Sequence, residues 1–405
     1  MDVSESKVSR TVSDMIKQGA VLKTGAARTS TLKLSPQIVY WTTPAHLRPS
    51  VHFDQTVVQN YVANQSQYLT KECQDRLLAI ITPQEPLDAS TYSHGVLERF
   101  LIDLSFASSA LEGNTYNQLE TEALIKYGQE AEGKPLHDAT MILNHKRAIS
   151  FVLDNMNAPL DNIFVCKLHA LLMRGLLGPE QLGVFRKTEV SISGSSYKPA
   201  TSSLLLQSSI SQIMYKAEEI INPFEAMIFV LANVSYVQAF DDGSKRIGRV
   251  LANIPLLRKG LPPLSFVGVD KNDYIQGLLE FYEQNSTETL SRSITEGYLQ
   301  AAHVYNMHKE ASTQPKMAEL RLRKTIDDIM PSIILSKITP DKIFDFVDKK
   351  VKNIAEKDRQ DLVEILINHI NALSSVSSVL WGVSEDDVKS YQETMQTSNA
   401  KKTRA

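Results

Sequence analysis

The residues best suited to chemistry lie in one short segment, residues 237–249, with the sequence Val-Gln-Ala-Phe-Asp-Asp-Gly-Ser-Lys-Arg-Ile-Gly-Arg. A nearly apolar stretch precedes it, so we expect a buried helix that ends near Phe240. Two acids and a glycine then predict a turn, and a second helix is expected from Ser244. Free N–H groups at a helix N-terminus, with cations beside them, form an anion site.

The same segment carries a candidate metal ligand. Asp242 adjoins the predicted helix start, and Mg²⁺ is usually bound through one or two carboxylates plus the phosphates of a substrate. The segment therefore has the outline of a phosphate and magnesium pocket. Two plainer interpretations stay open, because acids before a helix often only stabilise its dipole and arginines in a first turn are often solvated.

The segment resembles the signature motif of the Fic (Fido) family, His-x-Phe-x-Asp/Glu-Gly-Asn-Gly/Lys-Arg-x-x-Arg. Two positions depart from it, since Gln238 replaces the histidine and Ser244 replaces the asparagine. The matching positions are Phe240, Asp242, Gly243, Lys245, Arg246 and Arg249.

Two further segments resemble the family and occur in its order. Ser108-Ser-Ala-Leu-Glu-Gly-Asn114 is similar to the inhibitory motif Ser/Thr-x-x-x-Glu-Gly/Asn. Gly183-Val-Phe-Arg186 is similar to the Gly-x-Phe/Tyr-Arg segment, and a β-hairpin predicted over 188–198 would correspond to the substrate-binding flap. The resemblance covers about residues 100–310, roughly half of the chain.

The resemblance implies a protein adenylyltransferase-like enzyme that moves AMP from ATP onto a protein hydroxyl. Asp242 would bind Mg²⁺, and the amides of Gly243, Ser244, Lys245 and Arg246 would hold the α- and β-phosphates. Arg249 would meet either the γ-phosphate or Glu112, because a guanidinium suits phosphate and carboxylate equally well. The expected inhibitory residues are Ser108, Glu112, Gly113 and Asn114, and those of the flap and target site are Arg186, Val190, Ile192 and Tyr197.

Several of these residues also fit plainer roles. Ser108 and Glu112 share one helix side, so Ser108 is expected to pack or form hydrogen bonds. His169 and His145 lie in apolar runs and are expected to be satisfied core histidines. For Tyr197, a plain surface hairpin and a strand edge offered to a target peptide stay equally open.

Gln238 is the departure that matters for catalysis. In the family, the histidine takes the proton from the attacking hydroxyl. A general base needs an atom with a suitable pKa, and a glutamine amide can only donate and accept hydrogen bonds. We therefore expect impaired transfer. The alternative is a catalytically lost Fic domain that binds nucleotide or a partner as a regulator.

The elements expected to position these residues are mainly helices. Leu97 to Leu111 follow helical spacing before a capping Gly113, and further helices are expected over 138–154, 160–175, 203–220 and 223–238. Residues 20–55 contain three prolines and are expected to be irregular. Ser384 and Asp387 predict a capping box that opens the last helix.

Composition narrows the class of protein. The chain has 405 residues, 42% of them hydrophobic, and a net charge of −3, which gives no global footprint for nucleic acid. Two cysteines fit neither a disulfide framework nor a thiolate zinc site. With no signal segment or membrane span visible, we expect a cytoplasmic protein, and the sequence leaves a homo-oligomer open.

The sequence thus predicts a mainly α fold with a short β-hairpin flap and extra helices at both ends. The expected domains are a partly irregular N-terminal region over 1–90, a Fic domain with its inhibitory helix over 91–310, and a C-terminal helical region over 311–405.

Overall fold

The computed structural model describes residues 5–17, 19–25, 30–79, 94–311, 318–351, 354–371, 373, 378 and 381–402. The chain forms two compact units. The first comprises Met1–Phe53 with Val190–Pro199, and the second comprises Asp54–Glu189 with Ala200–Ala405. The second unit is built mainly from helices, whereas the first combines helices with short strands. None of the described helices is long and apolar enough to span a bilayer. The prediction of a mainly α chain is confirmed.

The first unit contains a β-hairpin that the sequence analysis missed. Strands β1 (Val21–Thr24) and β2 (Thr31–Leu34) pair antiparallel, and helix α1 (Glu5–Lys17) precedes them. Helix α2 (Pro36–Thr42) and 3₁₀ helix η2 (Ala45–Leu47) follow. The expectation of an irregular segment over 20–55 was therefore wrong. Pro36 does not break a helix there: it occupies the first turn of α2 behind the capping Ser35, where proline is favoured.

The prediction of a β-hairpin over 188–198 is also wrong. Within it only a turn forms, in which the Ser195 amide donates to Ile192 O at 3.1 Å. Strand β4 (Tyr197–Lys198) instead pairs in parallel with β3 (Val51–His52). The alternating pattern was real, but its hydrogen bonds go to a segment almost 150 residues earlier in the chain, which no local pattern reveals.

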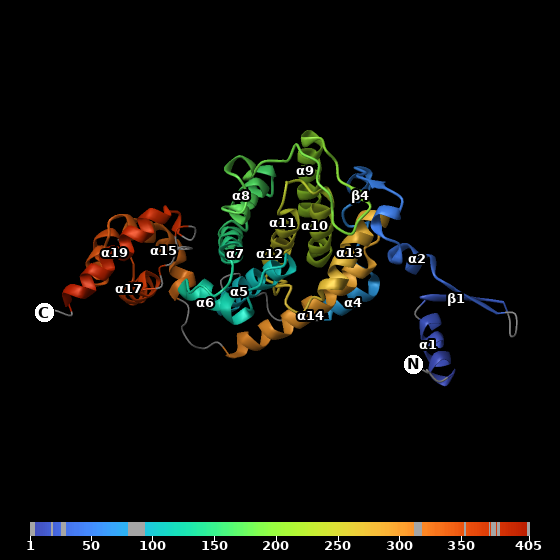
Figure 1. The fold of residues 1–405 in the computed structure, drawn as a ribbon, viewed down its shortest axis with the longest axis horizontal. Helices are drawn as coiled ribbons and strands as arrows, with labels where there is room; N and C mark the ends of the chain where they lie inside the picture. The colour runs from blue at the N-terminus through green and yellow to red at the C-terminus, as the bar shows by residue number, and fades with distance from the viewer. Residues whose placement is uncertain are drawn as a thin grey trace. The chain divides into compact units, whose positions relative to one another are not determined.

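The second unit is a helical assembly around α10 (Pro223–Val237). Every residue of α10 from Phe224 onward is buried, and the helix packs against α9, α11, α12 and α13, with α11 and α13 on opposite sides of it (Figure 1). The helices before and around it are α3 (Thr56–Gln59), α4 (Lys71–Leu78), α5 (His94–Leu111), α6 (Gln118–Tyr127), α7 (Leu136–Asp154), α8 (Asn162–Met173), η4 (Pro179–Gln181), α9 (Ser203–Glu219), α11 (Ser244–Leu251), α12 (Ile254–Arg258), α13 (Lys271–Gln284) and α14 (Glu288–Ala311). The helices predicted from spacing and caps are all present, with ends that differ by a few residues.

The C-terminal part of this unit is also helical. Its last helix opens with the predicted capping box, in which the Asp387 amide donates to Ser384 Oγ and the Ser384 amide donates to Asp387 Oδ2, each at 3.1 Å. Its elements are α15 (Ala318–Leu335), η5 (Pro340–Lys342), α16 (Ile343–Lys350), α17 (Glu356–Asn371) and α19 (Glu385–Lys402).

Candidate functional site

The junction between α10 and α11 positions the predicted motif. Helix α10 ends at Val237, three residues before the expected end, because Gln238 adopts a left-handed conformation with φ of 47°. Gly243 caps α11 with φ of 85°, and a Cβ there would lie 2.7 Å from Met173 Sδ on α8. The glycine is therefore required both by its backbone conformation and by the close approach of α8.

An aromatic stack supports the loop between the two helices. The ring of Phe240 lies between those of His169 and Phe185, with centroid separations of 4.0 and 5.2 Å. The Gly183 amide donates to His169 Nδ1 at 2.8 Å, so the ring's proton is on Nε2, which donates to Asp242 O at 3.1 Å. Burial lowers the pKa of His169 to about 4, so the ring is neutral. His169 is thus a core histidine, as expected, and it holds the loop.

Arg246 is a buried cation at the junction whose donor atoms are only partly paired. Its side chain is only 4% exposed, and its Nη2 donates to Asp242 Oδ2 at 2.6 Å. Its Nε and Nη1 are buried, and no described residue accepts a hydrogen bond from them. A buried guanidinium with unmet donors is costly, so these atoms are suited to an incoming anion.

Arg249 forms the ion pair expected with Glu112. Its Nη2 donates to Glu112 Oε1 at 2.6 Å, and Lys245 Nζ lies 3.7 Å from Glu112 Oε2. Burial raises the pKa of Glu112, but the charges of Arg249 and Lys245 outweigh it and bring the pKa to about 2. Glu112 therefore occupies a guanidinium that another anion would otherwise meet.

A second set of hydrogen bonds fixes Arg249 on α5. Arg249 Nε donates to Ser108 Oγ at 2.8 Å, and Arg249 Nη2 also donates to Ser108 O at 3.1 Å. His145 Nδ1 donates to Met141 O at 2.9 Å, so its Nε2 accepts from the Ser108 hydroxyl at 2.8 Å. Complete burial lowers the pKa of His145 to about 3. The sequence predicted a hydrogen-bonding Ser108 and a satisfied His145, but nothing in their spacing indicated that they contact each other.

Comparison with known proteins agrees with this geometry. Residues 159–256, which include the junction, match the model of the Fic/DOC family.

The chain carries a Fic domain.

Its relatives and a solved structure are consistent with that domain. The chain is 27% identical over 178 residues to a protein adenylyltransferase Fic of Nematostella vectensis. The aligned residues make up 43% of this chain and 41% of that protein. It is 24% identical over 206 residues to a protein of the same name from Drosophila yakuba, again 41% of that protein, so it matches under half the length of these relatives. A Fic family protein from Desulfovibrio desulfuricans G20 shares the fold, with a TM-score of 0.50, 16% identity, and coverage of 75% of this chain and 86% of that one.

In this Fic domain the Gln238 side chain folds back on α10. Its Nε2 donates to Ser235 O at 2.6 Å, and its backbone carbonyl accepts from Arg186 Nε at 2.6 Å. Arg186 is buried, and its other guanidinium nitrogens donate to Thr188 O and Ala200 O. Arg186 is thus bound to the backbone around the motif, a positioning contact beyond the target-site role expected for it.

The other acid of the Fic motif, Asp241, is held by neighbours. Gln181 Nε2 donates to Asp241 Oδ2 at 3.0 Å, and the Thr188 hydroxyl donates to Asp241 Oδ1. Burial raises the pKa of Asp241, but these hydrogen bonds outweigh it and leave the pKa below its usual value. A carboxylate with a lowered pKa is a weaker base, so Asp241 is poorly suited to take the place of a histidine.

The remaining predicted residues lie at two other places. Gly113 has φ of 93° at the end of α5, and Asn114 Nδ2 donates to Asp138 O at 2.8 Å, so both shape the turn that carries Glu112. Val190, Ile192 and Tyr197 belong to the first compact unit, where Tyr197 is buried opposite Val51.

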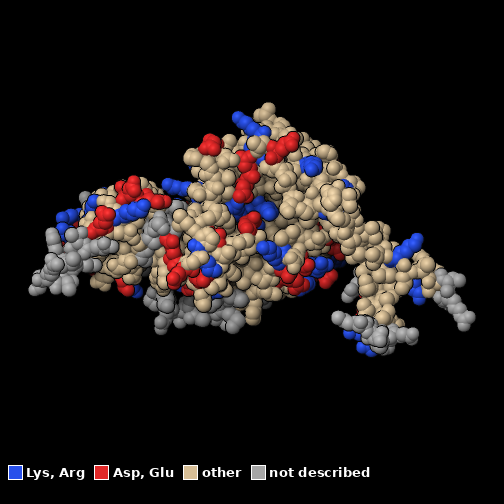
Figure 2. All heavy atoms as spheres, viewed as in Figure 1, with Lys and Arg blue, Asp and Glu red and all other residues tan. Residues whose placement is uncertain are grey.

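Charge is mixed on the face of the molecule shown in Figure 2. Basic and acidic side chains lie beside one another near the centre of the face shown in Figure 2. Within the part of the chain that the structure describes, no three His, Cys, Asp or Glu side chains gather as a metal cluster. A metal at the Fic motif would therefore depend on oxygens from a substrate as well as on Asp242, whose side chain is 57% exposed.

Proposed function

We propose that this protein is a Fic-type nucleotidyl transferase that moves AMP from ATP to a hydroxyl group of a protein, and does so slowly. The observation that carries the proposal is Arg246, a buried guanidinium with two unmet donor nitrogens at the start of α11. The relatives named protein adenylyltransferase support the choice of ATP as donor and of a protein as acceptor.

The α11 N-terminus supplies the rest of the phosphate site. Backbone N–H groups of Ser244, Lys245 and Arg246 are in the first turn of α11 and have no partner inside the helix. The expected Mg²⁺ would be held by Asp242 together with the substrate's phosphates, and it would neutralise charge on those phosphates. Asp242 suits this role because its carboxylate is exposed beside the site.

The chemical step explains why transfer is slow. The acceptor oxygen attacks the α-phosphorus, the bond to pyrophosphate breaks, and the hydroxyl proton must leave. Gln238 cannot take that proton, and its amide nitrogen is engaged with Ser235 O. General-base catalysis contributes roughly 10²–10⁴-fold, so charge stabilisation by the remaining site would support only slow turnover.

Glu112 would inhibit this site. It holds Arg249 at 2.6 Å, and a γ-phosphate would need the same guanidinium. A nucleotide that binds fully must therefore displace the carboxylate.

Calorimetry with ATP and Mg²⁺ tests the binding step. The parent protein and the Glu112→Gly variant should both bind, the variant more tightly, and Arg246→Ala should weaken binding by at least tenfold. Absence of binding in both the parent and Glu112→Gly would contradict the proposal. Intact-mass measurement of candidate proteins incubated with ATP then tests whether AMP is transferred.

A second candidate function is favoured by Gln238 alone. In that case the Fic domain binds nucleotide or a partner as a regulator and transfers nothing. Tight ATP binding without any mass increase on protein substrates, in both the parent and Glu112→Gly, would decide for it. With either function, we propose that the protein is cytoplasmic and that it can form a homo-oligomer.

A further inference from the structure

A second cavity lies along α7, away from the Fic motif. It is bordered by Lys146 and Arg147 of α7, by Arg174 at the end of α8, and by Asp327 and Trp381 of the C-terminal helical part. Three cationic and two anionic side chains border it, the second carboxylate being Asp154. Positive charge therefore exceeds negative charge in this cavity.

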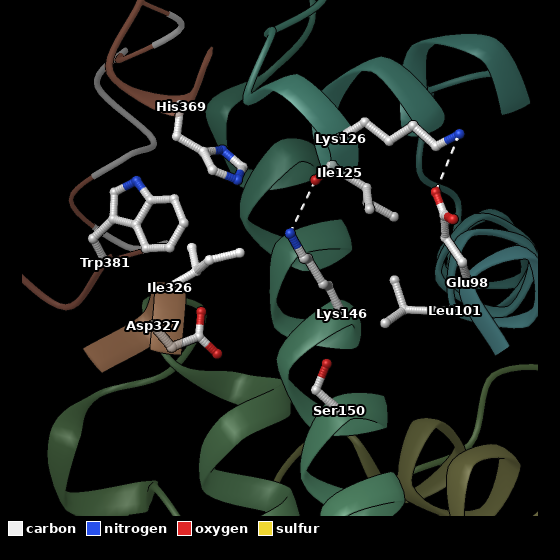
Figure 3. A pocket seen from close by; sticks show the side chains of 10 residues that line it. All are labelled: Glu98, Leu101, Ile125, Lys126, Lys146, Ser150, Ile326, Asp327, His369 and Trp381. Atoms are coloured by element: carbon white, nitrogen blue, oxygen red, sulfur yellow. Dashed lines mark hydrogen bonds and ion pairs between the residues drawn. The ribbon is translucent and has the colours of Figure 1, made fainter. Parts of the chain in front are cut away.

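The lysines on this side of the molecule are already engaged. Figure 3 shows the adjoining pocket, which shares Lys146, Asp327 and Trp381 with the cavity. Lys146 Nζ donates to Ile125 O at 3.0 Å, and Lys126 Nζ lies 3.3 Å from Glu98 Oε1. The two remaining cations are Arg147, which is partly buried, and Arg174, which is exposed.

Arg147 and Arg174 are held close together by the packing of α7 on α8. Asn144, one turn before Arg147, donates to Arg174 O at 2.7 Å. Arg147 Nη1 is buried, and no acceptor for it is present in the described part of the chain. Burial and the charge of Arg174 lower the pKa of Arg147 to about 10, although Asp327 acts in the opposite direction.

The C-terminal side of the cavity combines the Asp327 carboxylate with Trp381 and Gly382. The guanidinium of Arg174 lies over Gly382, where an added Cβ would be 3.7 Å from Arg174 Nη1. The Trp381 ring meets His369 edge to face, with centroids 5.0 Å apart, and Figure 3 shows the two rings on the same side of the pocket. A small anion between the arginines would therefore have a flat aromatic side chain beside it.

We propose that this cavity binds a small tetrahedral dianion, phosphate or a phosphate monoester, between Arg147 and Arg174. Guanidinium groups bind such anions through paired, charge-assisted hydrogen bonds, and the dianion would supply the acceptor that Arg147 Nη1 lacks. Because the walls come from α7 and α8 on one side and from Trp381 and Gly382 on the other, the ligand joins the C-terminal helices to the Fic domain. The site is independent of the nucleotide chemistry proposed above.

Tryptophan fluorescence of the full-length protein tests this site. The chain has two tryptophans, so Trp41→Phe leaves Trp381 as the sole one. Titration with inorganic phosphate at constant ionic strength should change the emission of Trp381 in a saturable way. Arg147→Gln and Arg174→Gln, made in this background, should each weaken binding at least tenfold. Phenyl phosphate should bind more tightly than phosphate if the aromatic wall contributes.

Two control variants make the result specific. Arg76→Gln removes an exposed arginine that pairs with Glu296 at 2.6 Å, and it should leave phosphate binding unchanged. Arg246→Gln should leave the Trp381 response to phosphate unchanged, because Arg246 lies at the Fic motif and does not border this cavity. Arg174 is exposed, so Arg174→Gln is the variant that decides. The proposal is overturned if the response is not saturable, if Arg174→Gln binds phosphate as the parent does, or if only Arg246→Gln abolishes the response.

Discussion

At the scale of single residues, Gln238 is one of two positions, with Ser244, at which this chain departs from the Fic motif, and it is the one that matters for proton transfer. It sits in a left-handed conformation that histidine also adopts more readily than most residues, so a histidine at this position requires no new backbone path. The substitution therefore changes the proton acceptor and leaves the loop in place.

Restoring the base should restore transfer. We expect Gln238→His to raise transfer of label from α-labelled ATP to protein on the order of 10²-fold or more. The gain should be largest together with Glu112→Gly, because that change frees Arg249. Brisk transfer by the parent, with no gain from Gln238→His, would show that another residue acts as the base.

Glu112 gives a second test at this scale. Its pKa of about 2 lies below its ordinary value of 4.5, so the ion pair with Arg249 is complete above pH 4.5 and is lost as the pH falls towards 2. Glu112→Gln removes the charge at all pH values, and we expect it to increase ATP affinity at pH 7 at least fivefold. Equal affinity of Glu112→Gln and the parent, measured by calorimetry, would exclude competition for Arg249.

At the scale of elements, the contact between α5 and α11 depends on one hydroxyl group. Ser108→Ala would leave both Arg249 Nε and His145 Nε2 without their partner, at a cost of about 1–3 kcal/mol in the free energy of unfolding. Ser105→Ala is the matched control, since Ser105 Oγ is equally buried on α5 and has no acceptor or donor among the described residues. Chemical denaturation should show a loss for Ser108→Ala only. Similar losses for both variants would mean that packing, and not the hydrogen bonds, matters there.

The elements also show what the sequence could and could not predict. Helices α5, α9 and α10 were predictable because apolar spacing and caps are local signals, and so was the turn at Gly243. The pairing of β4 with β3 was not, since it depends on a backbone far away in sequence. The same holds for the site. The motifs predicted Arg249 and Glu112, but the contact of His145 with Ser108 and the cavity at Arg147 arise only where α7 packs on α5 and α8.

At the scale of the whole molecule, two buried neutral histidines make stability depend on pH. His145 and His169 have pKa values of about 3 and 4 in the fold against an ordinary 6.5. Between pH 7 and 5.5 only the unfolded chain takes up these protons, so the free energy of unfolding should fall by about 1 kcal/mol for each histidine. Chemical denaturation at both pH values checks this, and His169→Gln should reduce the difference by about half. A free energy that does not change over this range would contradict the neutral assignment.

The way Arg249 is held has a consequence for the speed of any exchange at the Fic motif. Ser108 binds the guanidinium through both its hydroxyl and its carbonyl, whereas Glu112 lies just beyond the last residue of α5. A competing anion therefore has only to displace the Glu112 carboxylate by side-chain rotation. The Arg249 guanidinium keeps its hydrogen bonds to Ser108, and the packing of α5 does not change. Side-chain rotation is many orders of magnitude faster than helix displacement. Occupancy of Arg249 would thus follow nucleotide concentration without delay, and the lifetime of the free site would be set by diffusion.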